Sequence, residues 1–97
     1  DPTGIGTYRR VFSPMLQGDY FTFLGEKEED FGSNMRRIGI FDYKARKLVW
    51  EYELISIDEY EQTRNHLVPS KPLYMSGDKL YIKDIKDNLH IFEREDI

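Results

Sequence analysis

The sequence contains no cysteine, which excludes disulfide bonds, thiolate metal sites and a cysteine nucleophile. Only two histidines are present, His66 and His90, and neither has sequence neighbours that suggest a metal site or a catalytic triad. Motifs for a nucleophile elbow, a phosphate-binding loop or paired zinc ligands are also missing. The sequence therefore favours a non-enzymatic protein that uses no cofactor and no metal ion.

The chain also lacks a strong charge of either sign and a long hydrophobic run. Its 14 basic and 18 acidic residues give a net charge of −4, which provides no broad attraction to phosphate backbones or anionic lipids. No apolar run approaches the about 20 residues of a membrane helix. We therefore expect neither nucleic acid nor a membrane as the partner, and the cellular compartment is left open.

What the chain does contain is suited to a small sheet protein. Its 97 residues match one small domain, expected over residues 1–97. The aromatic content of 14% is enough to build a packed sheet face, whereas the charged content of 33% supplies a soluble surface. A single folded domain with one core is the expected organisation.

Residues 40–50 are the most informative stretch, because they have the pattern of a β-hairpin. Asp42 ends an apolar strand, a short basic turn follows, and Lys47 opens a second strand that carries the only tryptophan, Trp50. The second strand alternates with period two, as a half-buried strand does. The residues expected on its apolar face are Leu48, Trp50, Tyr52 and Leu54, and those expected on the opposite face are Val49, Glu51 and Glu53.

The same stretch resembles the tryptophan-docking motif of β-propellers of the pyrroloquinoline-quinone type. The motif of that family reads Ala-x-Asp-x-x-Thr-Gly-Lys-x-x-Trp, and Asp42, Lys47 and Trp50 match it at the family spacing. The positions that depart from it are Ile40, Ala45 and Arg46, which stand where the family has alanine, threonine and glycine. The tight Thr-Gly turn of the family is therefore not expected here.

The resemblance implies both a structural role and an alternative function. In the family the motif acts as a staple whose tryptophan packs against the adjacent blade, so this role is implied for Asp42, Lys47 and Trp50. Full-length members include quinone-dependent dehydrogenases, so the resemblance also implies, as the alternative, a fragment of a quinone-dependent oxidoreductase. The preferred interpretation is a non-enzymatic, propeller-blade-like binding or scaffold protein.

An internal repeat supports this interpretation. Residues 13–23 contain serine, proline and leucine, then Gly18 and Asp19, then an alternating strand, and residues 70–82 repeat this order with Gly77 and Asp78. Residues 89–93 are likewise similar to residues 38–42. We expect an all-β fold of antiparallel blade-like sheets with about seven strands. One repeat is expected over residues 12–54, a connecting segment over 55–69 and a partial second repeat over 70–97.

Two repeats are too few for a closed propeller, which has about four to eight blades. The chain could be the C-terminal piece of a larger propeller, could assemble from several copies, or could close as a small sandwich or barrel. Stacking of the two sheets face to face would bury Trp50 between them, and an open pair of sheets is expected to self-associate.

Shorter patterns predict the connections. The acidic stretch of residues 25–34 is expected to be a long, exposed hairpin loop rather than a calcium site, since it lacks the Asp-x-Asp-x-Asp-Gly spacing. Gly39 indicates close approach of a neighbouring group. Ser56, followed three residues later by Glu59, has the form of a capping box and predicts a short helix or compact loop over residues 57–66. The Asp-Asn pair near residue 88 suits a tight turn.

Protein binding is the expected activity, because loops on rigid sheets often carry recognition and tyrosine is enriched at interfaces. The candidate contact residues are Tyr60, Arg64, His66, Tyr74 and Tyr81. A protein partner or self-association is expected. A further alternative is a small acidic inhibitor or immunity-type protein, suggested by the small size, the negative charge and the tyrosines.

Overall fold

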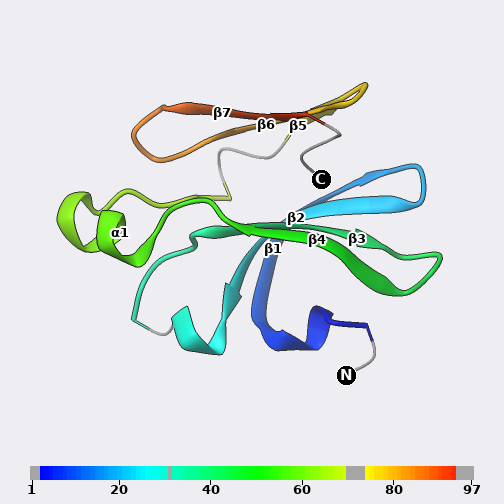
Figure 1. The fold of residues 1–97 in the computed structure, drawn as a ribbon, viewed down its shortest axis with the longest axis horizontal. Helices are drawn as coiled ribbons and strands as arrows, with labels where there is room; N and C mark the ends of the chain where they lie inside the picture. Colours follow the sequence, from blue (N-terminus) through cyan, green and yellow to red (C-terminus); the bar gives the residue numbers. More distant parts are fainter. Residues whose placement is uncertain (1–2, 31, 70–73, 94–97) are drawn as a thin grey trace.

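The computed structural model describes residues 3–30, 32–69 and 74–93, and seven strands and one α-helix lie within them (Figure 1). The strands are β1 (Tyr8–Gln17), β2 (Tyr20–Lys27), β3 (Arg37–Asp42), β4 (Lys47–Glu53), β5 (Tyr74–Ser76), β6 (Lys79–Lys83) and β7 (Leu89–Glu93). The helix α1 (Ile57–Thr63) separates β4 from β5, and short 3-10 turns occupy Ile5–Thr7 and Glu28–Asp30. The expected all-β fold with one short helix between the repeats is confirmed.

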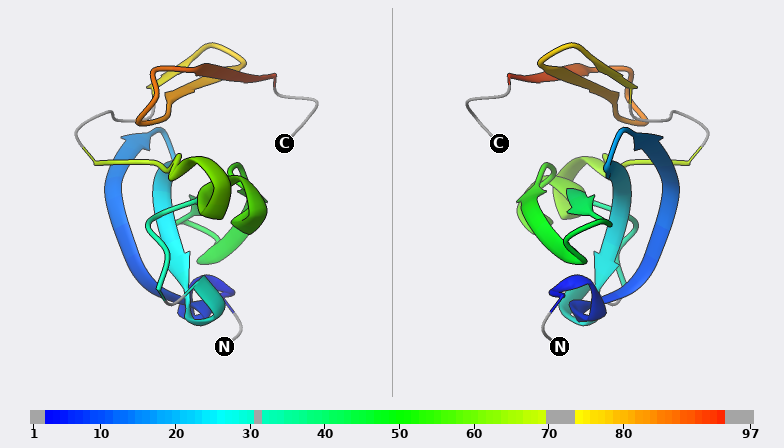
Figure 2. Two further views of the ribbon diagram at one scale, coloured as in Figure 1. Left: turned by 90° about the vertical axis from the view of Figure 1, so that its left-hand side faces the viewer. Right: turned by 90° about the vertical axis from the view of Figure 1, so that its right-hand side faces the viewer.

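The strands form two antiparallel sheets, one with the order β1-β2-β3-β4 and one with the order β5-β6-β7. Figure 1 shows them as two layers, with α1 at one end. The views in Figure 2 show that β1 and β2 curve strongly, whereas the smaller sheet is flatter. The prediction for residues 70–73 and 94–97, which begin and end the second repeat, lies outside the described residues.

The two sheets have the same pairing register over three strands. In the first sheet the pairs are Met15 with Thr22, Leu16 with Phe21, Thr22 with Ile40, and Phe21 with Phe41. The corresponding pairs in the second sheet are Tyr74 with Tyr81, Met75 with Leu80, Tyr81 with Ile91, and Leu80 with Phe92. The connecting turns also match, since Gly18 and Gly77 have φ angles of 61° and 58°. The two sheets are therefore equivalent in strand order, register and turn geometry.

The main core lies between the two sheets. It joins apolar side chains of β2 and β3 with those of β6, of α1 and of the connecting segments, namely Leu24, Met35, Ile38, Ile55, Tyr60, Leu67, Leu80 and Ile82. Burial of these side chains is the principal force that holds one layer on the other. The isolated bridge between Met35 and Leu67 ties the connection after α1 to the first sheet.

A second, smaller core covers the opposite face of the first sheet, where Tyr8, Phe23 and Phe41 are buried. Gly39 is essential to this core, because a Cβ atom at that position would lie 2.3 Å from Cζ of Phe23. The ring of Phe23 fills the space beside Gly39, its cross-strand partner. The predicted close approach at this glycine is confirmed, and the approaching group is an aromatic ring.

The expected alternation in β4 is wrong at Leu48, the second residue of the strand. Ile40 pairs with Trp50 but the next residue, Phe41, pairs with Leu48, so Val49 is an extra residue and forms a β-bulge. Leu48 therefore packs in the core with Phe41 on one face, whereas Trp50 packs toward the second sheet on the other face. The period-two pattern could not reveal this, since a bulge is defined by the pairing with the neighbouring strand.

The predicted helix and acidic loop are both shorter than expected. In α1, Oγ of Ser56 accepts a hydrogen bond of 3.1 Å from the backbone N–H of Glu59, which confirms the N-cap, but the helix ends at Thr63 because Arg64 adopts a left-handed conformation. The loop predicted from residue 25 begins later, since β2 continues to Lys27. Its last carboxylate, Asp30, is buried, so the prediction of a fully exposed acidic loop is wrong.

Candidate functional site

The turn that carries the resemblance is built around the carboxylate of Asp42. Its Oδ1 atom accepts hydrogen bonds from the backbone N–H groups of Lys44 and Ala45 at 3.1 and 3.0 Å, and Lys47 is its cross-strand partner. Arg46 occupies the position of the family's glycine and has a φ angle of 59°, which is the left-handed conformation that glycine favours. Arg46 thus adopts, without being glycine, a backbone conformation that glycine favours.

Arg46→Gly is expected to raise the free energy of unfolding by about 0.5–1 kcal/mol, because arginine bears a steric cost in the left-handed region that exceeds the extra freedom of glycine in the unfolded chain. The exposed Arg46 side chain makes little packing contribution. Urea unfolding followed by the fluorescence of Trp50 measures the difference. Lys44→Gly is the matched control in the same turn and is expected to destabilise, since Lys44 has a negative φ. Destabilisation by Arg46→Gly would contradict the steric account.

Trp50 lies where the two sheets meet. Its ring packs edge-on against Phe92 of β7, with ring centroids 5.5 Å apart, and stacks on Tyr52 at 6.1 Å. Tyr52 also contacts Phe92, at 5.4 Å. Trp50 is only partly buried, so it is less enclosed than the sequence suggested. The aromatic group joins β4 to β7 by contacts that are edge-to-face or stacked, which are favourable geometries.

The first three candidate contact residues gather beside α1. The guanidinium of Arg64 lies 5.3 Å from the ring centroid of Tyr60, and the ring of His66 meets the edge of Tyr60 at 6.3 Å. Tyr60 itself is 9% exposed and belongs to the main core. His66 Nδ1 lies 2.9 Å from the carbonyl oxygen of Arg64. This cluster closes the end of the core, and Tyr60 offers little surface to a partner.

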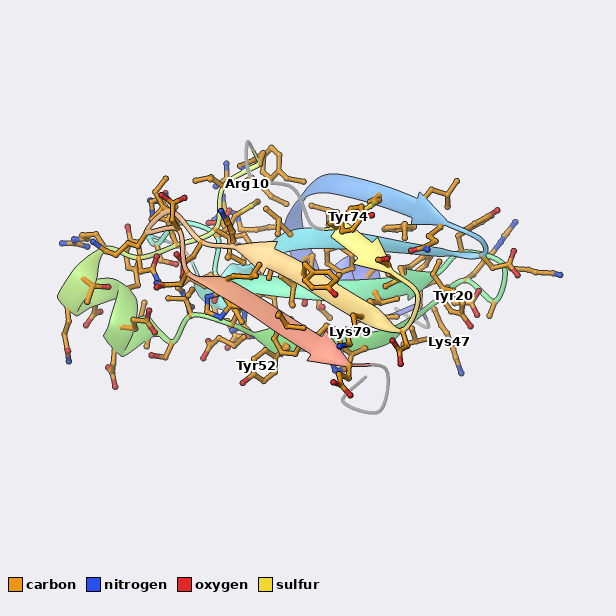
Figure 3. All side chains as sticks on the ribbon, turned by 90° about the horizontal axis from the view of Figure 1, so that it is seen from above. Arg10, Tyr20, Lys47, Tyr52, Tyr74 and Lys79 are labelled. Atoms are coloured by element: carbon orange, nitrogen blue, oxygen red, sulfur yellow. The ribbon has the colours of Figure 1, made fainter. Side chains whose placement is uncertain are left out.

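The other two candidates, Tyr74 and Tyr81, form a cross-strand pair on the second sheet, with ring centroids 6.1 Å apart. Tyr81 is in turn paired with Ile91, and Leu89 lies on the same face of β7. We call this surface, made by Tyr74, Tyr81, Leu89 and Ile91, the outer face. Tyr74, Leu89 and Ile91 are 61%, 53% and 52% exposed. Figure 3 looks down on this face and labels Tyr74 and Lys79 on it.

Sequence reasoning missed a buried ionic cluster beneath the first sheet. Asp30 is 2% exposed and pairs with Arg36 at 2.7 Å and with Arg37 at 2.8 Å, and Glu53 pairs with both arginines at 2.9 and 3.3 Å. Burial alone would raise the pKa of Asp30, but hydrogen bonds from Arg37 and from the backbone N–H of Lys27, together with the two positive charges, lower it. The same hydrogen bond to Asp30 raises the pKa of Arg37, so the contact favours the ionised form of both partners.

A second buried polar group, centred on Asp84, was also missed. Its Oδ2 atom accepts a hydrogen bond of 3.0 Å from Asn65 and lies 2.8 Å from Nε2 of His90. Its Oδ1 atom accepts from the backbone N–H groups of Lys86 and Asn88 at 2.9 and 3.0 Å, which closes the tight turn predicted there. Burial would raise the pKa of Asp84, but these hydrogen bonds outweigh it and hold the pKa far below the usual range. The Asp-His pair is thus part of a structural turn.

A third polar group lies on the face of the smaller core. The hydroxyl of Tyr8 donates to Glu51 at 3.3 Å, and Nζ of Lys27 donates to the same carboxylate at 2.6 Å. Burial and the neighbouring charge of Glu51 raise the pKa of Tyr8 well above its ordinary value, so its hydroxyl stays protonated. The group links β1, β2 and β4, and it acts as a structural contact.

None of these polar groups forms a metal site, since the described residues contain no cluster of three or more His, Asp or Glu side chains suited to a metal ion. Within the same residues no helix has the length and apolar character needed to cross a membrane. Comparison of the chain with protein-family models, with curated proteins and with solved structures finds no match. The outer face is therefore the strongest candidate site on structural grounds.

Proposed function

We propose that the chain is a non-enzymatic binding or scaffold protein of the propeller-blade-like type, which binds protein by stacking a further β-sheet on its outer face. The observation that carries this proposal is the exposure of three large apolar side chains, with the partly exposed Tyr81 among them, on one face of a sheet whose other face already packs on a sheet. An apolar patch of this kind on a soluble protein marks an interaction surface.

The register of the two sheets supports the choice of partner. Tyr81 and Ile91 stand at the positions that Thr22 and Ile40 hold in the first sheet, where the second sheet covers them and leaves 2% and 4% exposed. If a third sheet stacked on the second sheet as the second stacks on the first, it would cover the outer face. The ends of the face carry charges of both signs, with Lys79 and Glu93 paired at 3.9 Å at one end and Lys83 beside Leu89 at the other.

In a purified sample, the sheet that can stack on the outer face is that of a second copy of the chain. Self-association therefore tests the proposal directly. Sedimentation equilibrium is expected to show a concentration-dependent dimer or larger species. Ile91→Lys is expected to weaken association by about tenfold or more, because it places a charge at the centre of the buried patch. Ile85→Lys is the control, since Ile85 is 39% exposed but lies in the turn between β6 and β7. A wild-type chain that stays monomeric at about 1 mM, where even weak association is visible, would overturn the proposal.

A further inference from the structure

A pocket of about 390 Å³ lies between the two sheets, at the end where the matching Gly-Asp turns of β1-β2 and β5-β6 come together. Its apolar lining comes from Ile40 and Val49 of the first sheet and from Met75 of the second. The remaining lining residues are Gln17, Tyr20, Gly77, Asp78 and Lys79. Figure 3 labels Tyr20 and Lys79, which lie in the same half of the molecule. The volume falls within the range of small-molecule sites.

The β-bulge of β4 contributes directly to this pocket. Val49 is the extra residue of the bulge, and it is 42% exposed although it is a large apolar side chain. Tyr20, which also lines the pocket, is 43% exposed. Bulges commonly redirect a side chain at functional sites. The bulge thus adds an open apolar wall to a concave surface, where a flat strand would have continued the alternation.

An unsatisfied polar group lies beside the apolar lining. Thr22 is 2% exposed, and its hydroxyl has no hydrogen-bond partner among the described residues. Thr22 follows Tyr20 on the same face of β2 and is the cross-strand partner of Ile40. A buried hydroxyl without a partner is unfavourable, so a water molecule bound to it would stabilise this part of β2.

The charged side chains at this end of the pocket include Lys47, Lys79 and Asp78. The ammonium of Lys79 lies 3.9 Å from Glu93, so a carboxylate already compensates it. Lys47, at the same end (Figure 3), is the cross-strand partner of Asp42. The carboxylate of Asp78 is exposed and has no ion-pair partner within the described part of the chain. Asp78 is therefore the group at this mouth that can pair with a ligand, and the ligand charge it favours is positive; an aromatic side chain such as Tyr20 is a favourable neighbour for a cation as well.

We infer that the pocket between the sheets binds a small organic cation with an apolar body, its hydrocarbon on Ile40, Val49 and Met75 and its ammonium beside Asp78. The pocket lies on the other side of the second sheet from the outer face and shares with the end of that face only Lys79, so binding there requires no partner protein. A ligand of about ten heavy atoms in an open pocket is expected to bind with a Kd in about the millimolar range.

Titration of phenethylamine into the full chain, followed by two-dimensional NMR, tests the inference. Saturable shifts are expected at the amides of residues 17–20, 49 and 75–79. The neutral isostere 2-phenylethanol, and the variant Asp78→Asn with phenethylamine, are each expected to bind about three- to tenfold more weakly, because the ion pair is lost. Asp58→Asn on α1 is the matched control and is expected to leave binding unchanged.

Two results would overturn the inference. One is equal affinity of the amine and the alcohol, since it would show that Asp78 does not recognise the charge. The other is the absence of saturable shifts at the pocket, including the case in which shifts appear only on the outer face. Ile91→Lys separates this test from the self-association test, because it is expected to keep amine binding while it weakens association.

Discussion

Asp30→Asn is expected to lower the free energy of unfolding by about 3–5 kcal/mol, because it leaves the buried guanidinium of Arg36 without its closest carboxylate. The side chains of Asp30 and Arg36 are 1% and 3% exposed, so water cannot replace the lost contact. Small domains have a total stability of about 5–15 kcal/mol, so this single change removes a large fraction. Urea unfolding at neutral pH, followed by Trp50 fluorescence, measures the loss.

The control for Asp30 lies in the same 3-10 turn. Glu29 pairs with Arg37 at 3.7 Å, but its side chain is 69% exposed, and Glu29→Gln is expected to cost about 1 kcal/mol or less. A coupled pair also predicts non-additivity, so Arg36→Met is expected to cost less in the Asp30→Asn background than in the wild type, by about 1–3 kcal/mol. Additive effects, or equal losses for Asp30→Asn and Glu29→Gln, would show that the cluster is not a stabilising unit.

Asp84→Asn is the second substitution with a large expected effect, about 2–4 kcal/mol of unfolding free energy at neutral pH. The amide nitrogen of asparagine would face groups that now donate to the carboxylate, which leaves buried donors without an acceptor. Asp19→Asn is the control, because Asp19 is exposed in the turn between β1 and β2, and it is expected to change stability by about 0.5 kcal/mol or less.

The pH dependence of Asp84 follows from its lowered pKa. A carboxyl group whose pKa is lower in the folded state than in the unfolded state, where it is about 3.9, stabilises the fold above that pH and loses this contribution as the pH falls. The difference in stability between wild type and Asp84→Asn is therefore expected to be smaller at pH 3 than at pH 7. A difference that is constant from pH 7 to pH 3 would mean that the charge of Asp84 does not stabilise the fold.

Features with a local sequence signal were predicted well. The strands of the hairpin around Trp50 follow from period two, the start of α1 follows from Ser56, and the close approach at Gly39 follows from a glycine within an apolar strand. The repeat of the Gly-Asp turn predicted two similar sheets, and the strand pairs on either side of the two turns have the same register. Each of these signals lies within a few neighbouring residues.

The candidate site was predicted only in part. Tyr74 and Tyr81 were named as contact residues and share the outer face, but Leu89 and Ile91, which complete it, were not named. Their alternation with His90 and Phe92 was visible, but the sequence does not say which face of a strand is covered. That choice depends on the layer that packs against it.

The sequence by itself determined the strands, their turns and the duplication, because local backbone preferences and period-two patterns act over a few residues. Only the tertiary structure decided that Val49 bulges, that Asp30 and Asp84 are buried with partners 6 and 19 residues away, and which apolar face stays open. These outcomes arise from pairing between strands and stacking between sheets. Burial makes an unpaired charge costly, so buried carboxylates require partners, and the outermost sheet of a stack keeps one face uncovered.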